Sequence, residues 1–293
     1  MKKSRKRLLI SSVAMLLVAM LALGTATFAW FTQSTTARTQ NLSVQTTKAS
    51  TLTISKSDNN WGNIVNYANP SSNPLTLDPA STVEGGKTAS NWVNFTAGGD
   101  NADVTGAALL STLKTLTNDS GTNPISGYVF MEQLNIRNEG SAAVTNVKIN
   151  FQLPESDGFN YIRVALVPTN GVGLDKNDVY GTGKAFKDFI YASNATAYSG
   201  AKGVTGSGDT AALDVAEITP KDASSASFSV AVTGSGESLA AANKTDPENP
   251  VYDEKYYNLY VWFEGQDPQC VNANAGIQIP DIVFKVTGDT VTS

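Results

Sequence analysis

A stretch of alternating apolar and polar side chains constrains the fold of this chain more than its composition does. The stretch is AVTNVKINFQL, residues 143–153. Its apolar positions of one parity are Ala143, Val147, Ile149, Phe151 and Leu153, and the polar positions of the other parity are Asn146, Lys148, Asn150 and Gln152. A period of two is what a strand with one buried face requires. The stretch therefore predicts a half-buried β-strand.

Similar short runs follow one another after residue 41, separated by clusters of Gly, Asn, Asp, Ser and Pro. Strands are expected at 128–137, 161–167, 225–233, 256–264 and 276–286, and 42–55 predicts a strand pair or one kinked strand. Pro280 should bend or break the last run, because proline suits a sheet edge or a bulge. Many short strands with turn clusters predict an all-β sandwich.

Two short helices are expected as additions to the sheets. Residues 107–116 carry leucines at helical spacing, and 184–192 carry Phe186, Phe189 and Ile190 in the same way. Long polar segments interrupt the strand pattern elsewhere. We expect a single sandwich domain over 42–293, with insertions near 58–125 and 171–222.

The N-terminus predicts a secretory signal peptide over residues 1–29. Five basic residues precede an apolar run of 16 residues, Leu8 to Leu23, and small residues follow as far as Ala29. Cleavage between Ala29 and Trp30 would leave 16 Lys and Arg against 26 Asp and Glu, a net charge of −10. The alternative is an uncleaved anchor, although the run is short for a span of about 30 Å. The membrane is expected as a partner only before cleavage.

The composition narrows the chemistry. Histidine is absent, which removes Ser-His-Asp and Cys-His nucleophile systems and His-ligated zinc sites. Cys270 is the only cysteine, so no intrachain disulfide can form, and it is either buried or available to pair between chains. The acidic charge disfavours nucleic acid as a partner. We expect no enzyme, no catalytic residue, no metal and no cofactor.

Two further groups of residues are candidate binding positions. Glu264, Asp267 and Asp281 could supply oxygen ligands to Ca²⁺, although an ordinary polar turn is the alternative. Trp61 and Trp92 lie in the loop-rich region and could stack on sugars as surface-binding aromatics, or bury themselves in the core or an interface.

Three stretches resemble one family. They are GTATFAWFTQSTTARTQNLSVQTTKASTLTIS (24–55), FMEQLNIRNEGSAAVTNVKINFQL (130–153) and YYNLYVWFEGQDPQCVNANAG (256–276). Together they are similar to the TasA/camelysin group, exported proteins of Gram-positive bacteria that a dedicated signal peptidase of the SipW type processes. The camelysin branch is described as a metalloprotease, but this chain has no HExxH motif.

The resemblance implies a jelly-roll-like β-sandwich, secreted into the biofilm matrix or to the cell surface, where it polymerises head to tail into fibres. An accessory matrix protein is a further implied partner. In that group the freed N-terminal segment pairs as a strand with the next subunit. Residues 30–41 would then be a donor strand with Trp30 and Phe31 as assembly anchors. The alternatives are that these aromatics fold back on their own sandwich, and that the chain is a surface adhesin or carbohydrate-binding module.

Overall fold

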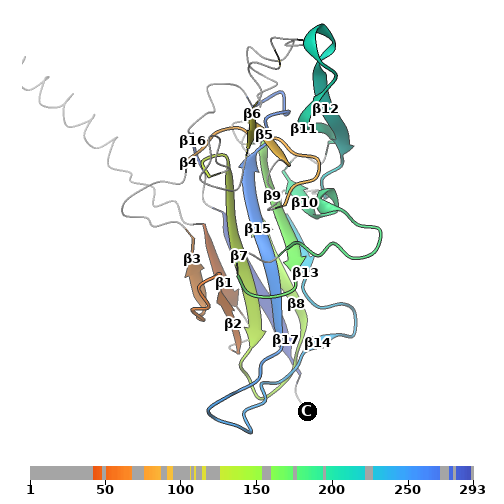
Figure 1. Cartoon of the computed structure of the whole chain (residues 1–293). Coiled ribbons are helices and arrows are strands. Elements are labelled where there is room, and N and C mark those ends of the chain that lie inside the picture. Colours follow the sequence, from red (N-terminus) through yellow and green to blue (C-terminus); the bar gives the residue numbers. More distant parts are fainter. Residues whose placement is uncertain are drawn as a thin grey trace, which may run out of the picture. The chain divides into compact units, whose positions relative to one another are not determined.

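The alternating stretches form two β-sheets that pack face to face (Figure 1). The computed structural model describes residues 42–47, 51–67, 76–86, 91–94, 106, 109, 114–116, 126–153, 160–173, 177–193, 196–221, 227–270, 277–279 and 282–291. All of them belong to one compact unit, Gln40–Ser293. The expected signal peptide and the expected donor strand, with Ala29, Trp30 and Phe31, lie outside the described residues.

The first sheet has the strand order β13-β8-β17-β1-β3, and β14 pairs with β8 beyond the end of β13. The strands are β13 (Ser227–Ala231), β8 (Val144–Gln152), β17 (Val283–Thr290), β1 (Ser43–Thr47), β3 (Ile64–Asn66) and β14 (Ser238–Leu239). Only β1 and β17 run parallel, with Ser43 opposite Val283. The other pairs are antiparallel.

The second sheet has the order β10-β9-β15-β7-β2, and all of its pairs are antiparallel. The strands are β10 (Ile190–Ala192), β9 (Ile162–Thr169), β15 (Glu254–Phe263), β7 (Val129–Asn138) and β2 (Leu52–Ser55). Strands β1 and β2 follow each other in the chain but lie in different sheets. The stretch 42–55 therefore forms two strands rather than one kinked strand, but the two do not pair with each other.

Short elements decorate the sandwich, and no helix of the described chain exceeds one turn. Three two-stranded ribbons are β11 (Tyr198–Thr205) with β12 (Ala212–Ile218), β4 (Thr76–Leu77) with β16 (Ile277–Gln278), and β5 (Trp92–Asn94) with β6 (Lys114–Leu116). The single-turn 3₁₀ helices are η1 (Phe186–Phe189) and η2 (Gly208–Thr210). The protein is an all-β sandwich.

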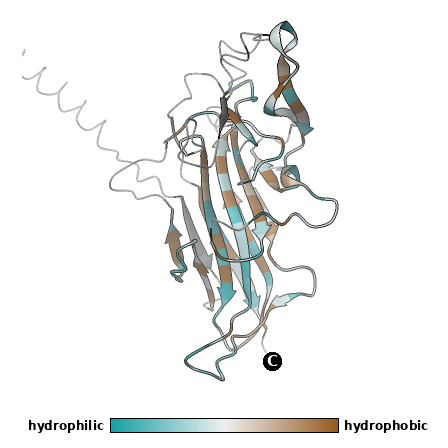
Figure 2. Cartoon of the chain, viewed as in Figure 1, coloured by the Kyte–Doolittle hydropathy of each residue, from teal (hydrophilic) through white to brown (hydrophobic). Residues whose placement is uncertain are grey.

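The core between the sheets takes alternate residues from every long strand. Along β15 these are Tyr257, Leu259, Val261 and Phe263, and opposite them lie Phe284 and Val286 of β17. Figure 2 shows brown and teal bands alternating along the long strands, as this arrangement requires. Burial of these apolar side chains supplies the main favourable term in folding.

Most of the expected strands are confirmed, with one shift of parity. Strands β7, β9, β13, β15 and β17 fall in the expected stretches, and β16 and β17 are separated around Pro280, itself outside the described residues. In β8, however, Val144 is buried where Ala143 was expected. Asn146 adopts a left-handed φ of 52°, and the pairing with β17 shifts register there. This β-bulge re-aims the first residues of the strand.

Gly288 of β17 faces this bulge and explains how the two strands can lie so close. A Cβ atom added at this position would lie 2.5 Å from Cγ1 of Val144 and 3.2 Å from Cδ1 of Leu52. Both neighbours belong to the core and are fully buried. Glycine is therefore the residue that this close approach allows.

Of the two expected helices, the one over 184–192 is wrong, and the one over 107–116 is confirmed only near its start, where Gly106 and Leu109 are α-helical. In 184–192 the chain makes one 3₁₀ turn, η1, and then enters β10. In 107–116 the last three residues, Lys114–Leu116, form strand β6 against β5. At 190–192 and at 114–116, pairing with a neighbouring strand overrides a short local preference for helix, since most helical stability in proteins comes from packing.

Replacing Leu259 by alanine should lower the free energy of unfolding by about 2–5 kcal/mol, because it leaves a cavity in the centre of β15. Lys285→Ala on the exposed face of β17 is the control and should change stability by about 0.5 kcal/mol or less. Urea denaturation measures both. Equal effects would contradict the assignment of the core.

Candidate functional site

The two outermost strands of the second sheet, β2 and β10, are bonded to other segments of the chain. The backbone of Ile54 in β2 exchanges hydrogen bonds of 2.8 and 2.9 Å with Gly62. The carbonyl oxygen of Ile190 in β10 accepts a 2.7 Å bond from the N–H of Lys221. These contacts satisfy backbone groups that an open strand would offer to another chain.

Strand β13 at the edge of the first sheet has no strand partner on its outer side among the described residues. The N–H of Val232 donates to the carbonyl of Val147 in β8 at 2.8 Å. By strand alternation Phe228 and Val230 also turn their backbone groups to β8, while Ser227, Ser229 and Ala231 turn theirs outward. Within the described part of the chain, nothing pairs with this outer side. β13 is thus a site where a further strand can add.

A partly exposed apolar strip lies beside this edge, where the two sheets meet. Val230 and Val232 of the first sheet and Tyr191 of β10 pack on the core without being fully buried. The ring of Phe228 stacks on Phe151 at 5.0 Å between centroids and meets Tyr191 edge-on at 5.3 Å. A strand added to β13 could place apolar side chains against this strip.

The opposite side of the sandwich is closed by side chains. Tyr67, which follows β3, donates its hydroxyl to the carbonyl of Gln133 in β7 at 2.9 Å, and the N–H of Gln133 donates to the carboxylate of Glu132. Burial, with the nearby Glu132 and Asp58 carboxylates, raises the pKa of Tyr67 well above its usual value, so it stays a neutral donor. β3 is the outer strand here, and it is only three residues long.

Trp92 is not a surface aromatic, so that prediction is wrong for this residue. Its side chain is fully buried on the outer face of the second sheet, and its indole N–H donates to the carbonyl of Gly86 at 2.9 Å. The rings of Phe186, Tyr260 and Trp262 surround it at centroid distances of 5.2 to 6.3 Å. Trp92 therefore belongs to a second core, as the alternative interpretation from the sequence allowed.

Trp61 is half-buried, and the guanidinium of Arg137 lies over one face of its ring at 4.0 Å from the centroid. Tyr252 stacks on the same guanidinium at 4.1 Å. The indole N–H of Trp61 donates to the side chain of Asn59. An aromatic ring with a cation already in place has less free face for a sugar, so this geometry favours a structural role for Trp61.

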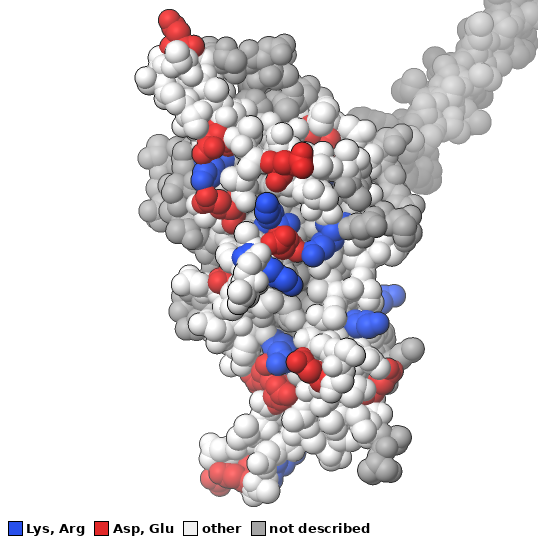
Figure 3. Space-filling model, turned by 90° about the vertical axis from the view of Figure 1, so that its right-hand side faces the viewer, with Lys and Arg blue, Asp and Glu red and all other residues white. Residues whose placement is uncertain are grey.

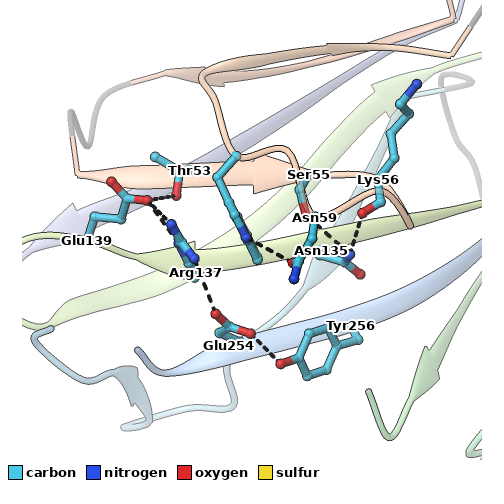
Figure 4. A network of polar contacts seen from close by, with 10 residues as sticks. Thr53, Ser55, Lys56, Asn59, Asn135, Arg137, Glu139, Glu254 and Tyr256 are labelled. Atoms are coloured by element: carbon cyan, nitrogen blue, oxygen red, sulfur yellow. Dashed lines mark hydrogen bonds and ion pairs between the residues drawn. The ribbon is translucent and has the colours of Figure 1, made fainter. Parts of the chain in front are cut away.

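The polar contacts around Arg137 form a network across three neighbouring strands (Figure 4). Arg137 of β7 pairs with Glu139 at 2.5 Å and with Glu254 of β15 at 3.6 Å, and Glu139 accepts from Thr53 of β2. Glu254 also accepts from the hydroxyl of Tyr256, whose pKa burial raises to about 12, with a smaller contribution from that carboxylate. The network ties the edge strand β2 to the centre of the sheet.

A buried ionic cluster occupies the other end of the same face. Arg163 of β9 donates to the carboxylate of Asp267 at 2.8 Å, and both are nearly inaccessible. Glu264 is fully buried and accepts from the indole of Trp262 and the N–H of Gln266. Desolvation raises the pKa of Glu264 above its ordinary value, although Arg163 works against this shift.

Two of the three residues considered for Ca²⁺, Glu264 and Asp267, thus already have other partners. Asp267 accepts a hydrogen bond from Arg163, and Glu264 accepts one from the indole of Trp262. Asp281 lies outside the described residues. Within the described ranges, no group of three or more His, Cys, Asp or Glu side chains is placed to hold a metal ion. Cys270 is buried, and desolvation raises its pKa, which agrees with the interpretation as an inert buried thiol.

Comparison with protein-family models, with curated proteins and with solved structures gives no match to this chain. The resemblance noted from the sequence motifs therefore stays a prediction. None of the helices in the described residues is both long and apolar enough to span a membrane.

Trp92→Ala should lower the free energy of unfolding by about 3–5 kcal/mol, because it empties the centre of the second core. Trp61→Ala should lower it by about 1 kcal/mol or less, the contribution of one partly exposed cation–π contact. Chemical denaturation of both variants checks this. A larger loss for Trp61 than for Trp92 would contradict the assignment.

Because the pKa of Glu264 is raised, the stability of the folded chain should depend on pH. The folded chain binds this proton more tightly than the unfolded chain, so the contribution of Glu264 to stability falls as pH rises above its ordinary pKa of 4.5. The free energy of unfolding of the wild type should therefore decline with pH relative to Glu264→Gln. Urea melts between about pH 4.5 and about pH 7 test this. Parallel curves for the two proteins would show that the pKa is not raised.

Proposed function

We propose that this chain is a secreted, non-enzymatic subunit of extracellular fibres, in the biofilm matrix or at the cell surface. In this proposal a signal peptidase removes residues 1–29, and residues 30–41 of one subunit add as a strand to the next. The observation that carries it is the open edge of β13, with the outward backbone groups of Ser227, Ser229 and Ala231.

The position of β1 supports a head-to-tail arrangement. The proposed donor segment joins the described chain at Leu42, directly before β1, and β1 lies toward the β3 edge of the first sheet. The proposed acceptor, β13, is the opposite edge of that sheet. The point where the donor segment joins the sandwich and the acceptor edge are therefore different strands of the first sheet. Contacts of this kind generate open filaments when the rotation between subunits does not close a ring.

The chemistry of the two segments is complementary. The outer edge of β13 offers backbone donors and acceptors over five residues, enough for part of a 12-residue segment to pair. The strip of Tyr191, Val230 and Val232 offers partly exposed apolar surface beside it. Trp30 or Phe31 could lie on this strip as an anchor, since aromatic side chains bury large apolar areas.

The alternative function, a carbohydrate-binding adhesin, has less support. Of its two proposed aromatics, Trp92 is buried in the second core and Trp61 is stacked on Arg137. Fibre assembly instead uses a surface that is open in the described chain.

Filament growth is the test. We expect protein of residues 30–293 to form filaments in negative-stain microscopy, and protein that starts at Asn41 to stay dispersed. Ser229→Pro should also prevent filaments, because proline removes an outward N–H without breaking the ladder to β8. Light scattering gives the same comparison in solution.

Ser229→Ala is the matched control, because it keeps the N–H and should assemble as the wild type does. Both Ser229 variants should melt cooperatively, which separates lost assembly from lost folding. Filaments of Ser229→Pro that match the wild type would exclude β13 as the acceptor. If residues 30–293 never assemble at high concentration, the fibre proposal fails and the adhesin becomes the leading candidate.

A further inference from the structure

Three exposed lysines from separate parts of the sequence lie around the short turn η1, and we name them the lysine patch: Lys184, Lys187 and Lys221. Two backbone hydrogen bonds bring them together. Ile190 donates its N–H to the carbonyl of Lys187 and accepts the N–H of Lys221 at 2.7 Å. Lys184 reaches the same turn, with its ammonium 5.8 Å from the ring centroid of Phe189.

The lysine patch carries a local positive charge on an acidic protein. Asp188 is the acid within η1, and its carboxylate accepts the N–H of Ala185. With Asp188 included, the patch has a net charge of +2. In the described part of the chain none of the three lysines forms an ion pair. Figure 3 shows several blue side chains near mid-height with red ones among them, and further red side chains toward both ends.

The hairpin β11–β12 is an acidic element that projects from one end of the sandwich (Figure 1). It carries Asp209, Asp214 and Glu217 against Lys202, a net charge of −2. Lys202 is already paired with Glu84 and lies 3.9 Å from Asp214. Asp209 in the tip and Glu217 on β12 are exposed. The hairpin therefore presents negative charge, which is complementary to the positive charge of the lysine patch.

The rest of the surface favours another copy of this chain as the occupant of the patch. Residues 30–293 carry a net charge of −10, so two copies repel each other over most orientations. The repulsion is least where the lysine patch of one copy meets an acidic surface of another. The same net charge opposes a free polyanion, such as a polyphosphate, at every approach except the patch itself.

We propose that the lysine patch receives the acidic hairpin β11–β12 of a second copy of this chain. The contact rests on the proposed fibre function, to which it adds an ionic interaction that orients neighbouring subunits. Charge complementarity of this kind sets orientation and association rate more than affinity. It is also screened by salt, since the Debye length falls to about 10 Å at 0.1 M.

Charge reversal tests the contact in residues 30–293 carrying Ser229→Pro, where strand addition to β13 is blocked. The dissociation constant for self-association is measured by sedimentation equilibrium at low salt. Lys187→Glu with Lys221→Glu should raise it about tenfold, as expected for two exposed ion pairs. Asp209→Lys with Glu217→Lys should do the same. A mixture of the two variants should associate at least as tightly as the parent, because the charges are then complementary again.

Lys148→Glu with Lys285→Glu is the matched control, because both lysines are exposed on the outer face of the first sheet, away from η1. It changes the net charge equally and should raise the dissociation constant far less. Equal weakening by the control, or no rescue in the mixture, overturns the proposal. The proposal is also overturned if the lysine patch binds polyphosphate and its charge reversal leaves the dissociation constant for self-association unchanged.

The two proposals fail in distinguishable ways. If residues 30–293 form filaments and neither charge reversal changes the critical concentration for assembly, the fibre function stands and the patch contact is wrong. If no filaments form but salt-sensitive pairing is lost on reversal and restored in the mixture, the patch contact stands without strand addition.

Discussion

Burial of the second sheet on both of its faces is the constraint on which the rest of the structure depends. The inner residues of β15 enter the core between the sheets, and its outer residues, such as Tyr260 and Trp262, enter the second core around Trp92. A polar side chain on the outer face then has little water to bind and needs a partner from the chain. The long insertions supply those partners.

The middle of this outer face shows how the insertions are held. The amide of Gln133 donates to the carbonyl of Gly171 and accepts the N–H of Gly173. The amide of Asn258 donates to Asp178 at 2.7 Å, and the hydroxyl of Tyr260 donates to the same carboxylate. Segments that look like loose polar loops in the sequence are thus fixed to the sheet by its own buried amides, because each unsatisfied group would cost about 1–3 kcal/mol.

The two sheets therefore differ in how much of their outer face and of their strand edges stays exposed to solvent. The second sheet is covered on its outer face, and both of its outermost strands are bonded to other segments. The first sheet keeps exposed polar residues such as Lys148 and Gln152 on its outer face, and in the part of the chain that the structure describes its edge strand β13 has no further partner. This asymmetry is why our proposals place strand addition on the first sheet and assign a supporting role to the second.

The sequence predicts those parts of the fold in which one strand face meets water. Alternation located β8 and β13, because half-buried strands show a period of two. It could not show the bulge at Asn146, since a left-handed residue changes parity without a change in composition. It also could not place Trp92, because burial on the outer face depends on an insertion that folds back from far along the chain. The open edge of β13 depends on which strands pair, which one sequence does not reveal.

The parallel pairing of β1 with β17 has a consequence for how the chain folds. Ser43 and Val283 are partners although they lie 240 positions apart in the sequence. Closing so long a loop costs conformational entropy before any contact is gained, and folds rich in such distant pairs form slowly. The first sheet also cannot gain β17, which lies between β8 and β1, until that strand has been synthesised. The growing chain therefore lacks a complete sandwich until residues 283–290 have been made, and in the secretion route that we propose this is the interval in which it would pass through a translocation channel in an extended form.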